Sequence, residues 1–311
     1  MKIGFISDLH TDVNREYPVM DTLAQAAMQQ ELDVLAIAGD ISESPETTLR
    51  EVEKLAACLE TKSGCRLVYI PGNHDMWNKH CPDRDADEIY RKYCEDPRCL
   101  CGKAFALEAG TRSGGGADKA AGTAGEDYAA SSTGKAPRRV FLIGDIGWYD
   151  YSMASADYTN EQMEEMTWNG RTWQDKLYNV WTRDNAGKAA WFEERLRMQA
   201  AECRKQMQDN DTLIVLTHML PVRDFCVPQE LPPGWGYFNG FLGSTGLGDV
   251  IRGSGAAIAV CGHVHYRSTV NKDNILWICP CLGTFDEWPL FGIGETSLAG
   301  HIRNALFVMQ I

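Results

Sequence analysis

Polar side chains able to bind metal ions follow several apolar runs of the sequence, at the point where each run ends. The run "CRLVYI", for example, leads into "PGNHD", whose last four residues have little tendency to pack in a core. Carboxylate, amide and imidazole groups together are typical of sites for borderline divalent cations such as Mn, Fe or Zn. In chain order, the polar residues at these positions are Asp8, His10, Asp40, Asn73, His74, Asp75, His218, His263 and His265.

The apolar runs that carry these residues alternate with helical patterns over the first hundred residues. We expect strands at residues 2–8, 33–40 and 65–75, with helices at about 19–31 and 45–59. Strands that are apolar on both faces and joined by helices favour a parallel sheet covered on both sides. Right-handed crossovers then place the carboxyl ends of the strands at one edge, where ligands bind in such sheets. Further strands are expected at residues 139–145, 211–218 and 255–265, so the alternation alone predicts one open sheet.

The residue types at this edge indicate a site for two metal ions. Asp40 is the natural bridge, because one carboxylate can bind a different ion through each oxygen. Two ions about 3.5–4 Å apart can hold a bridging hydroxide and clamp the oxygens of an in-line displacement at phosphorus. We expect Gly72 to permit a tight turn and His74 to protonate the leaving oxygen or stabilise charge on the phosphoryl group. Asp75 is predicted to orient the His74 ring.

Composition and charge restrict the class of protein. The chain has 311 residues, 44% of them hydrophobic, and a net charge of −13, which disfavours non-specific attraction to nucleic acid or anionic membranes. It has no apolar run of the roughly 18 residues that a membrane span needs, and no export signal, so we expect a cytoplasmic protein. The eleven cysteines are accordingly expected to be mostly reduced. Whether Cys81, Cys94, Cys99 and Cys101 bind a structural metal stays open, although their CxC end lacks the usual CxxC spacing.

Two segments of the single predicted domain (1–311) differ from the rest. Residues 110–137 are rich in Gly, Ala and Ser and lack apolar periodicity, which predicts a flexible low-complexity insertion. Residues 148–206 are rich in aromatic residues and predict a helical, cap-like region over the polar edge. The candidate substrate contacts, Trp77, Trp148 and Tyr149, follow the apolar runs closely enough to reach that edge, although core packing is the favoured interpretation of these aromatic residues.

Five ordered blocks resemble the motifs of the calcineurin-like metallophosphoesterase superfamily. The blocks are "DLH" (residues 8–10), "GD" (39–40), "GNHD" (72–75), "TH" (217–218) and "GHVH" (262–265). The resemblance implies an α/β fold whose core is a β-sandwich of two mixed sheets flanked by helices, instead of one open sheet. It also implies that one metal ion takes Asp8, His10, Asp40 and His265, and that the other takes Asp40, Asn73, His218 and His263.

The resemblance therefore implies a phosphoric ester hydrolase with two divalent ions, of which Mn, Fe, Zn and Ni are candidates. The expected reaction is hydrolysis of a small phosphodiester or phosphomonoester by a metal-bridging hydroxide. The family's protein phosphatases carry an Arg soon after the "GD" block and end the third block in Glu, whereas this chain has "GDISES" and "GNHD". The difference disfavours protein phosphatase activity. The alternatives are a metal-dependent nuclease, which would need a basic groove, and a non-catalytic scaffold, in which the ligand positions could drift. The oligomeric state is not predicted.

Overall fold

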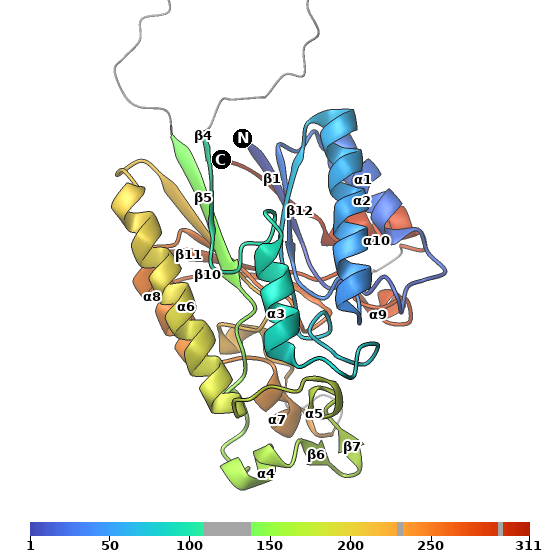
Figure 1. The fold of residues 1–311 in the computed structure, drawn as a ribbon, viewed down its shortest axis with the longest axis vertical. Coiled ribbons are helices and arrows are strands. Elements are labelled where there is room, and N and C mark those ends of the chain that lie inside the picture. The colour runs from blue at the N-terminus through green and yellow to red at the C-terminus, as the bar shows by residue number, and fades with distance from the viewer. Residues whose placement is uncertain (109–137, 229–232, 292–294) are drawn as a thin grey trace, which may run out of the picture.

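The first of two large sheets has four strands, three from the N-terminal part of the chain and one from its C-terminal end. The computed structural model describes residues 1–108, 138–228, 233–291 and 295–311. In the order β12-β1-β2-β3, the first sheet joins β12 (Phe307–Gln310), β1 (Lys2–Ile6), β2 (Val34–Ala38) and β3 (Arg66–Ile70). The three strands β1 to β3 are parallel, and β12 runs antiparallel to β1, so the two chain ends lie side by side (Figure 1). All five side chains of β2 are buried, as expected for a strand covered on both faces.

A second sheet of six strands packs beside the first. Its order β10-β11-β9-β8-β5-β4 joins β10 (Arg267–Lys272), β11 (Ile275–Pro280), β9 (Ile258–Val260), β8 (Thr212–Thr217), β5 (Arg139–Asp145) and β4 (Ala104–Glu108). The four inner strands are parallel, whereas β4 and β10 are antiparallel edges. The expected two mixed sheets are confirmed, and the single open sheet is wrong. After β3 the chain crosses to the second sheet, and it returns to the first sheet only with β12.

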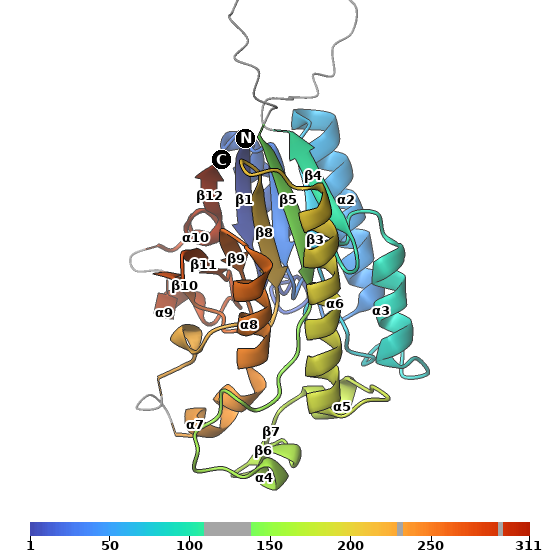
Figure 2. The same ribbon diagram turned by 90° about the vertical axis from the view of Figure 1, so that its left-hand side faces the viewer.

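Helices cover the outer faces of the two sheets (Figure 2). The first sheet is covered by α1 (Val19–Gln29), α2 (Pro45–Ser63) and α10 (Leu298–Ala305), and the second by α6 (Asn185–Gln206) and α8 (Thr245–Ser254). The bounds of α2 follow from local chemistry, because the Ser44 hydroxyl accepts a bond from the Thr47 amide and Gly64 ends the helix at φ 71°. The helix α3 (Ala86–Glu95) lies on the same side as α2.

Short elements gather at the end of the molecule where the parallel strands finish (Figure 1). They are α4 (Asn160–Glu164), β6 (Thr167–Trp168), β7 (Arg171–Thr172), α5 (Asp175–Tyr178) and α7 (Trp235–Phe238). The second half of the chain also contains the 3₁₀ turns Arg223–Phe225 and Asn239–Phe241 and the helix α9 (Trp288–Phe291). Residues 148–206 therefore form short helices, a two-stranded ribbon and the long helix α6.

Two sequence predictions concern features at or beyond the limits of the described chain. The insertion predicted at residues 110–137 lies outside the described residues. Its described neighbours, Glu108 and Arg139, are paired on β4 and β5 at the end opposite the short elements. In the described part of the chain, no helix combines the length and the apolar character needed to cross a bilayer.

Candidate metal centre

Two groups of metal-binding side chains lie at the carboxyl ends of the parallel strands. The first contains Asp8, His10, Asp40 and His265, and the second contains Asp40, His218 and His263. In each group the possible ligand atoms lie within 4.8 Å of one another. Neither of these two groups, which were found among the described residues, includes a cysteine. All eleven cysteines are free thiols. The strand ends predicted from sequence thus meet at one place.

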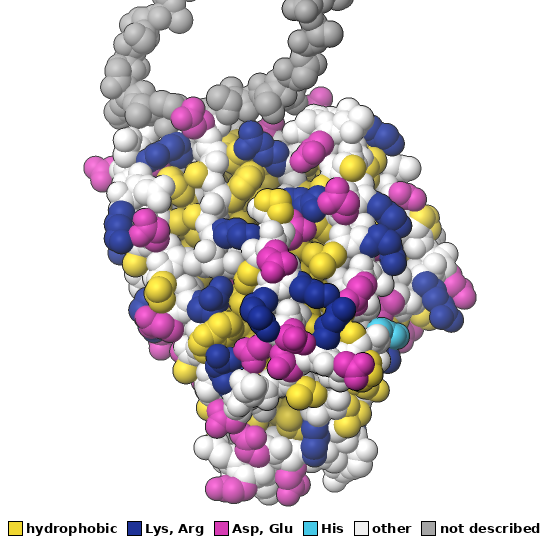
Figure 3. All heavy atoms as spheres, in the orientation of Figure 1, with side chains coloured by type: hydrophobic (Ala, Val, Ile, Leu, Met, Phe, Trp, Pro, Cys, Tyr) yellow, Lys and Arg dark blue, Asp and Glu magenta, His cyan; other side chains and the backbone are white. Residues whose placement is uncertain are grey.

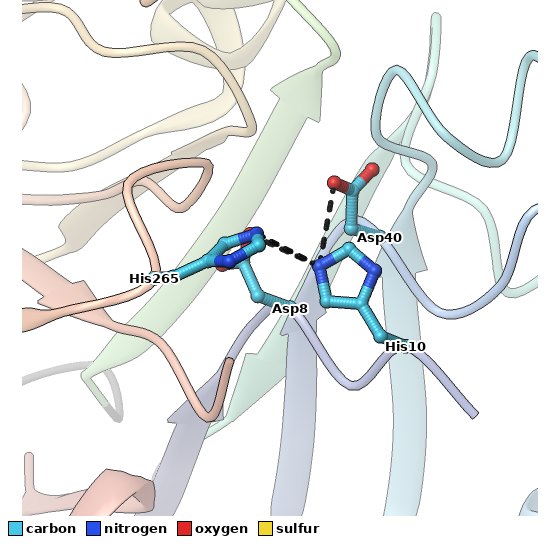
Figure 4. A group of neighbouring side chains, drawn as sticks. All are labelled: Asp8, His10, Asp40 and His265. Carbon is cyan, nitrogen blue, oxygen red and sulfur yellow. Dashed lines mark hydrogen bonds and ion pairs between the residues drawn. The ribbon is translucent and has the colours of Figure 1, made fainter. Parts of the chain in front are cut away.

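The first group has two imidazoles that face each other. The Nε2 atoms of His10 and His265 are 2.9 Å apart, and the His10 Nε2 atom lies 3.8 Å from Asp40 Oδ2 (Figure 4). The Asp8 Oδ1 atom is 4.0 Å from His10 Nε2 and 3.7 Å from His265 Nε2. Two imidazole nitrogens and two carboxylates that converge on one point suit a divalent cation.

The second group contains buried atoms without hydrogen-bond partners. The Asp40 Oδ2 and His263 Nδ1 atoms are buried and have no hydrogen-bond partner among the residues that the structure describes. His218 Nε2 lies 3.2 Å from Asp40 Oδ2 and 3.1 Å from Asn73 Oδ1. Buried polar groups are normally paired, so orphaned acceptors beside an imidazole and an amide oxygen fit a metal ion. Asn73, which the family resemblance assigns to this group, therefore lies where that assignment needs it.

Backbone carbonyls set the orientation of the two histidines in the second group. His218 Nδ1 lies 2.9 Å from the Ala38 carbonyl oxygen, and His263 Nε2 lies 3.2 Å from that of Phe241. An N–H that donates to each carbonyl leaves the other ring nitrogen, Nε2 of His218 and Nδ1 of His263, with its lone pair facing the site. Such partners fix the tautomer of metal-binding histidines.

Asp40 faces both groups through one oxygen. Its Oδ1 atom accepts a hydrogen bond from the backbone amide of His74 at 2.9 Å, whereas Oδ2 is the atom nearest His10 and His218. Oδ2 is therefore the oxygen that lies between the two groups, and the expectation that each oxygen serves a different ion stays a prediction. Gly72 is needed for close approach, because a Cβ at this position would lie 2.1 Å from Asp40 Oδ1.

Five of the predicted ligands have strained backbones. Positive φ angles occur at Asp8 (57°), His10 (41°), Asp40 (53°), His263 (76°) and His265 (60°). Non-glycine residues seldom adopt this conformation, and such strain concentrates at functional sites. The turns that follow the strands hold these side chains in place at a cost in backbone energy.

Burial and mutual proximity dominate the electrostatics of the histidines. Burial, together with neighbouring imidazoles, lowers the pKa of His10, His74 and His263 well below the ordinary value. Burial also opposes protonation of His218 and His265, but nearby carboxylates outweigh it and raise the pKa of each to about 9. Burial raises the pKa of Asp40 to about 6. The carboxylates thus create a demand for positive charge, which a proton or a metal ion can meet.

Asp75 braces the loops and does not orient His74. Its carboxylate accepts hydrogen bonds from the amides of Ile41, Ser42 and Gly72 at 2.8–3.2 Å and from the Thr48 hydroxyl at 2.5 Å. The His74 Nδ1 atom has no partner among the described residues. The predicted bond between the two side chains is therefore wrong, because backbone amides and a hydroxyl occupy the carboxylate that would accept it.

Sequence reasoning missed two carboxylates that hold ligands from behind. Glu287 Oε2 lies 2.8 Å from His265 Nδ1 and also accepts bonds from the amide and hydroxyl of Thr284. Asp175 accepts a bond from the Asn73 side-chain amide at 2.9 Å. Neither residue lies in a motif block or at the end of an apolar run, so the sequence carried no signal for them.

The family profile of calcineurin-like phosphoesterases matches residues 1–267. The chain belongs to the calcineurin-like phosphoesterase family. Among solved structures it is similar to a phosphopantetheinyl hydrolase from Mycobacterium tuberculosis (TM-score 0.64, 18% identity, 96% of this chain and 94% of that one). A dimetal phosphatase from Danio rerio is also similar (TM-score 0.41, 13% identity, 90% and 86%). No curated protein matches the sequence.

Beside the metal groups of this phosphoesterase lies a cavity of about 420 Å³. The residues that line it are Asn73, His74, Trp77, Arg171, Thr172, Trp173, Gln174 and Asp175. The His74 ring stacks on the Trp77 indole with 3.8 Å between ring centroids, and its Nε2 atom lies 3.9 Å from Asp40 Oδ2. His74 thus separates the metal groups from the cavity and can contact a molecule bound across both.

Only one of the three predicted aromatic contacts lines this cavity, and it is Trp77. Trp148 is 1% exposed, packs against Phe192 and donates its indole N–H to Asn185. Tyr149 is fully buried, and its hydroxyl donates to Asp175 at 3.4 Å. Direct substrate contact by Trp148 and Tyr149 is not supported, because both side chains are used in core packing.

Proposed function

We propose that this protein is a dinuclear metal-dependent phosphoesterase that hydrolyses a small phosphodiester or phosphomonoester. The observation that carries the proposal is the position of Asp40 Oδ2, a buried oxygen between His10 and His218 that has no hydrogen-bond partner in the described part of the chain. Two groups that share one carboxylate oxygen suit two adjacent ions better than one. Mn, Fe, Zn and Ni all accept this mixed set of oxygen and nitrogen ligands.

The residues divide between two ions as follows. Asp8, His10, Asp40 and His265 would hold one ion, and Asp40, Asn73, His218 and His263 the other. Bound ions would supply an activated water and would neutralise charge on the phosphoryl oxygens. The protein's own contribution is to keep imidazole lone pairs directed at the site and to exclude bulk water, since seven of the nine motif residues are buried, leaving His74 and His265 partly accessible.

His74 acts on the substrate side of the centre. Its ring lies between Asp40 and the cavity, where an N–H can donate a hydrogen bond to a phosphoryl oxygen or to the departing oxygen of the ester. Stacking on Trp77 fixes the plane of the ring. Asp75 contributes indirectly, by holding the turns after β2 and β3 together.

The cavity favours a small organic group as the alcohol part of the ester. Its volume lies toward the lower end of the range found for small-molecule pockets, and two indoles, Trp77 and Trp173, form part of its walls. Among the described residues that line it, Arg171 is the one arginine or lysine; it is exposed, so it can meet a second anionic group at the entrance. We expect substrates whose alcohol part is partly apolar.

A nuclease needs a basic groove for a long polyanion. On the face of the molecule shown in Figure 3, acidic and basic side chains are interspersed over the surface. With a net charge of −13 and one arginine in the cavity, small esters are better supported than nucleic acid. The scaffold alternative has no observation in its favour, because every ligand position is filled. Location in the cytoplasm stays a prediction.

The proposal is tested with metal-stripped protein resupplied separately with Mn, Zn, Fe and Ni. Hydrolysis of bis-p-nitrophenyl phosphate is compared with that of p-nitrophenyl phosphate and of a phosphopantetheinyl compound, the latter because a phosphopantetheinyl hydrolase shares the fold. Asp40→Asn protein purified in parallel controls for contaminating phosphatases. Metal-dependent turnover of any of the three esters supports the proposal, and the preferred ester defines the class. Bound metal without turnover of any ester contradicts it.

A further inference from the structure

One buried carboxylate outside the motif blocks gathers an unusual number of hydrogen-bond donors. Asp175 is 3% exposed and lies at the start of α5, on the segment between β5 and α6. Five donors reach its two oxygens at 2.6–3.4 Å: the side-chain amides of Asn73 and Asn179, the indoles of Trp77 and Trp173 and the hydroxyl of Tyr149. A carboxylate offers about four acceptor positions, so this one is saturated. It has no free lone pair with which to bind a metal ion or act as a base.

The bond to Asn73 decides which way the Asn73 amide faces. Asn73 Nδ2 donates to Asp175 Oδ1 at 2.9 Å, and its Oδ1 atom is thereby turned toward His218, at 3.1 Å from Nε2. A flipped amide would direct N–H groups at the metal position and bring two oxygens together at Asp175. The Asn179 side chain also donates to the Asn73 backbone carbonyl at 3.1 Å, which fixes the loop itself.

The same carboxylate holds two walls of the cavity. The indole N–H groups of Trp77 and Trp173 donate to Asp175 at 2.6 and 3.0 Å, one to each oxygen. Trp77 in turn supports the His74 ring by stacking. Asp175 therefore connects the metal ligand, the histidine on the substrate side and the cavity.

We propose that Asp175 is a positioning residue that orients Asn73 toward the second metal ion and holds the indole walls of the substrate cavity. The inference rests on the proposed function for the presence of a second metal ion, but it is tested by metal binding alone. The first group, which lies on the far side of Asp40 and is braced by Glu287, should not depend on Asp175.

The first test is Asp175→Asn, measured by calorimetric titration of metal-stripped protein with Mn²⁺. An amide in place of the carboxylate has one acceptor oxygen for five donors, so at least one N–H must face another. We expect one of the two Mn²⁺ sites to weaken by roughly 10- to 100-fold, the effect typical of losing a residue that orients a ligand. The other site should keep its affinity, and the electron spin resonance signal of a coupled Mn²⁺ pair should give way to that of single ions.

A charge exchange separates positioning from a general loss of structure. Asn73→Asp alone sets two carboxylates against each other, whereas Asn73→Asp combined with Asp175→Asn restores a donor and an acceptor at the same contact. We expect the double variant to bind the second Mn²⁺ more tightly than either single variant. The comparison of the double variant with Asn73→Asp remains decisive if Asp175→Asn does not fold. Tyr149→Phe, which removes a donor from the other oxygen, should leave both Mn²⁺ affinities unchanged.

Two results on the variants would overturn the inference. In the first, Asp175→Asn protein binds two Mn²⁺ ions as the wild type does; in the second, the double variant binds Mn²⁺ no more tightly than the single variants. Wild-type protein that binds fewer than two Mn²⁺ ions would overturn it as well. If the metal results are as expected but the wild type hydrolyses no ester, the proposed function is wrong and the role of Asp175 stands. If KM rises in Asp175→Asn in addition to the fall in kcat, the indole walls of the cavity have loosened.

Discussion

The two metal groups use similar ligands but are supported by different parts of the molecule. The first group is built from turns after β1, β2 and β9, and its supporting carboxylate, Glu287, follows β11 of the second sheet. The second group also has its ligands on strand ends, but its supporting carboxylate, Asp175, comes from the short elements that lie outside both sheets. One group is thus held by the core of the fold, and the other partly by a segment added to it.

This difference indicates how a phosphoesterase centre can keep its ligands while its substrate site changes. A segment that carries cavity residues such as Trp173 and Arg171 also carries the carboxylate that orients Asn73. Changes in that segment would therefore alter substrate binding and the second ion together, while the first ion remains bound. We expect the first site to have the higher metal affinity for this reason.

The largest effect is expected from Asp40→Asn, because Asp40 belongs to both metal groups and its loss should affect them together. Loss of the shared carboxylate should lower Mn²⁺ content at both sites and reduce activity by about a thousandfold or more, since metal ions supply several kcal/mol of transition-state stabilisation. Elemental analysis and kinetics on the same sample provide the measurement. A variant with full metal content and full activity would exclude Asp40 as the bridge.

His74→Ala should affect turnover but neither metal group. The ring lies beside Asp40 and over the cavity without a place in either group, so metal content should stay near the wild-type value. We expect kcat to fall by roughly 10²- to 10⁴-fold, the range typical of a lost acid or hydrogen-bond donor. Metal content is measured alongside kcat, and loss of an ion would make His74 a ligand instead.

Glu287→Gln is the counterpart of Asp175→Asn, because it removes the carboxylate that supports the first metal group instead of the second. The bond to His265 lowers the pKa of Glu287 against the effect of burial, so the carboxylate is charged and supports the imidazole. Replacing it should weaken Mn²⁺ binding at the first site by roughly 10- to 100-fold and leave the second site intact. Calorimetric titration of the two variants should give opposite patterns; the same pattern in both would mean that the two groups do not act separately.

The smallest effect is expected from deletion of residues 112–135. Glu108 and Arg139 are direct neighbours on β4 and β5, at the end of the sheet remote from both metal groups, and residues 109–111 and 136–138 remain to join them. Stability to urea should rise by no more than about 1–2 kcal/mol, because a shorter loop costs less closure entropy. Mn²⁺ affinity should not change. Lost solubility or metal binding would contradict the prediction that this segment is a dispensable insertion.

Much of the metal centre could be predicted because its residues follow a local rule. Apolar runs end on polar residues at Asp8, Asp40, Asn73 and His218, and parallel strands bring such ends to one edge whatever the order of the strands. The prediction of one sheet failed for the same reason, since alternation of strands and helices reports local burial and not which strands pair. Only the family resemblance indicated two sheets.

The residues that could bind metal ions, and their meeting at one edge, could be predicted from the order of residues in the chain. The tertiary structure was needed to show that Asp40 Oδ2 lies nearest His10 and His218, that Asp75 accepts hydrogen bonds from backbone amides and that Trp148 lies in the core. It also decided the roles of Asp175 and Glu287, which contact their ligands across 102 and 22 positions of the chain. The physical reason is that a hydrogen bond depends on distances and directions in space. The spacing of residues along the chain constrains these only within one strand, helix or turn.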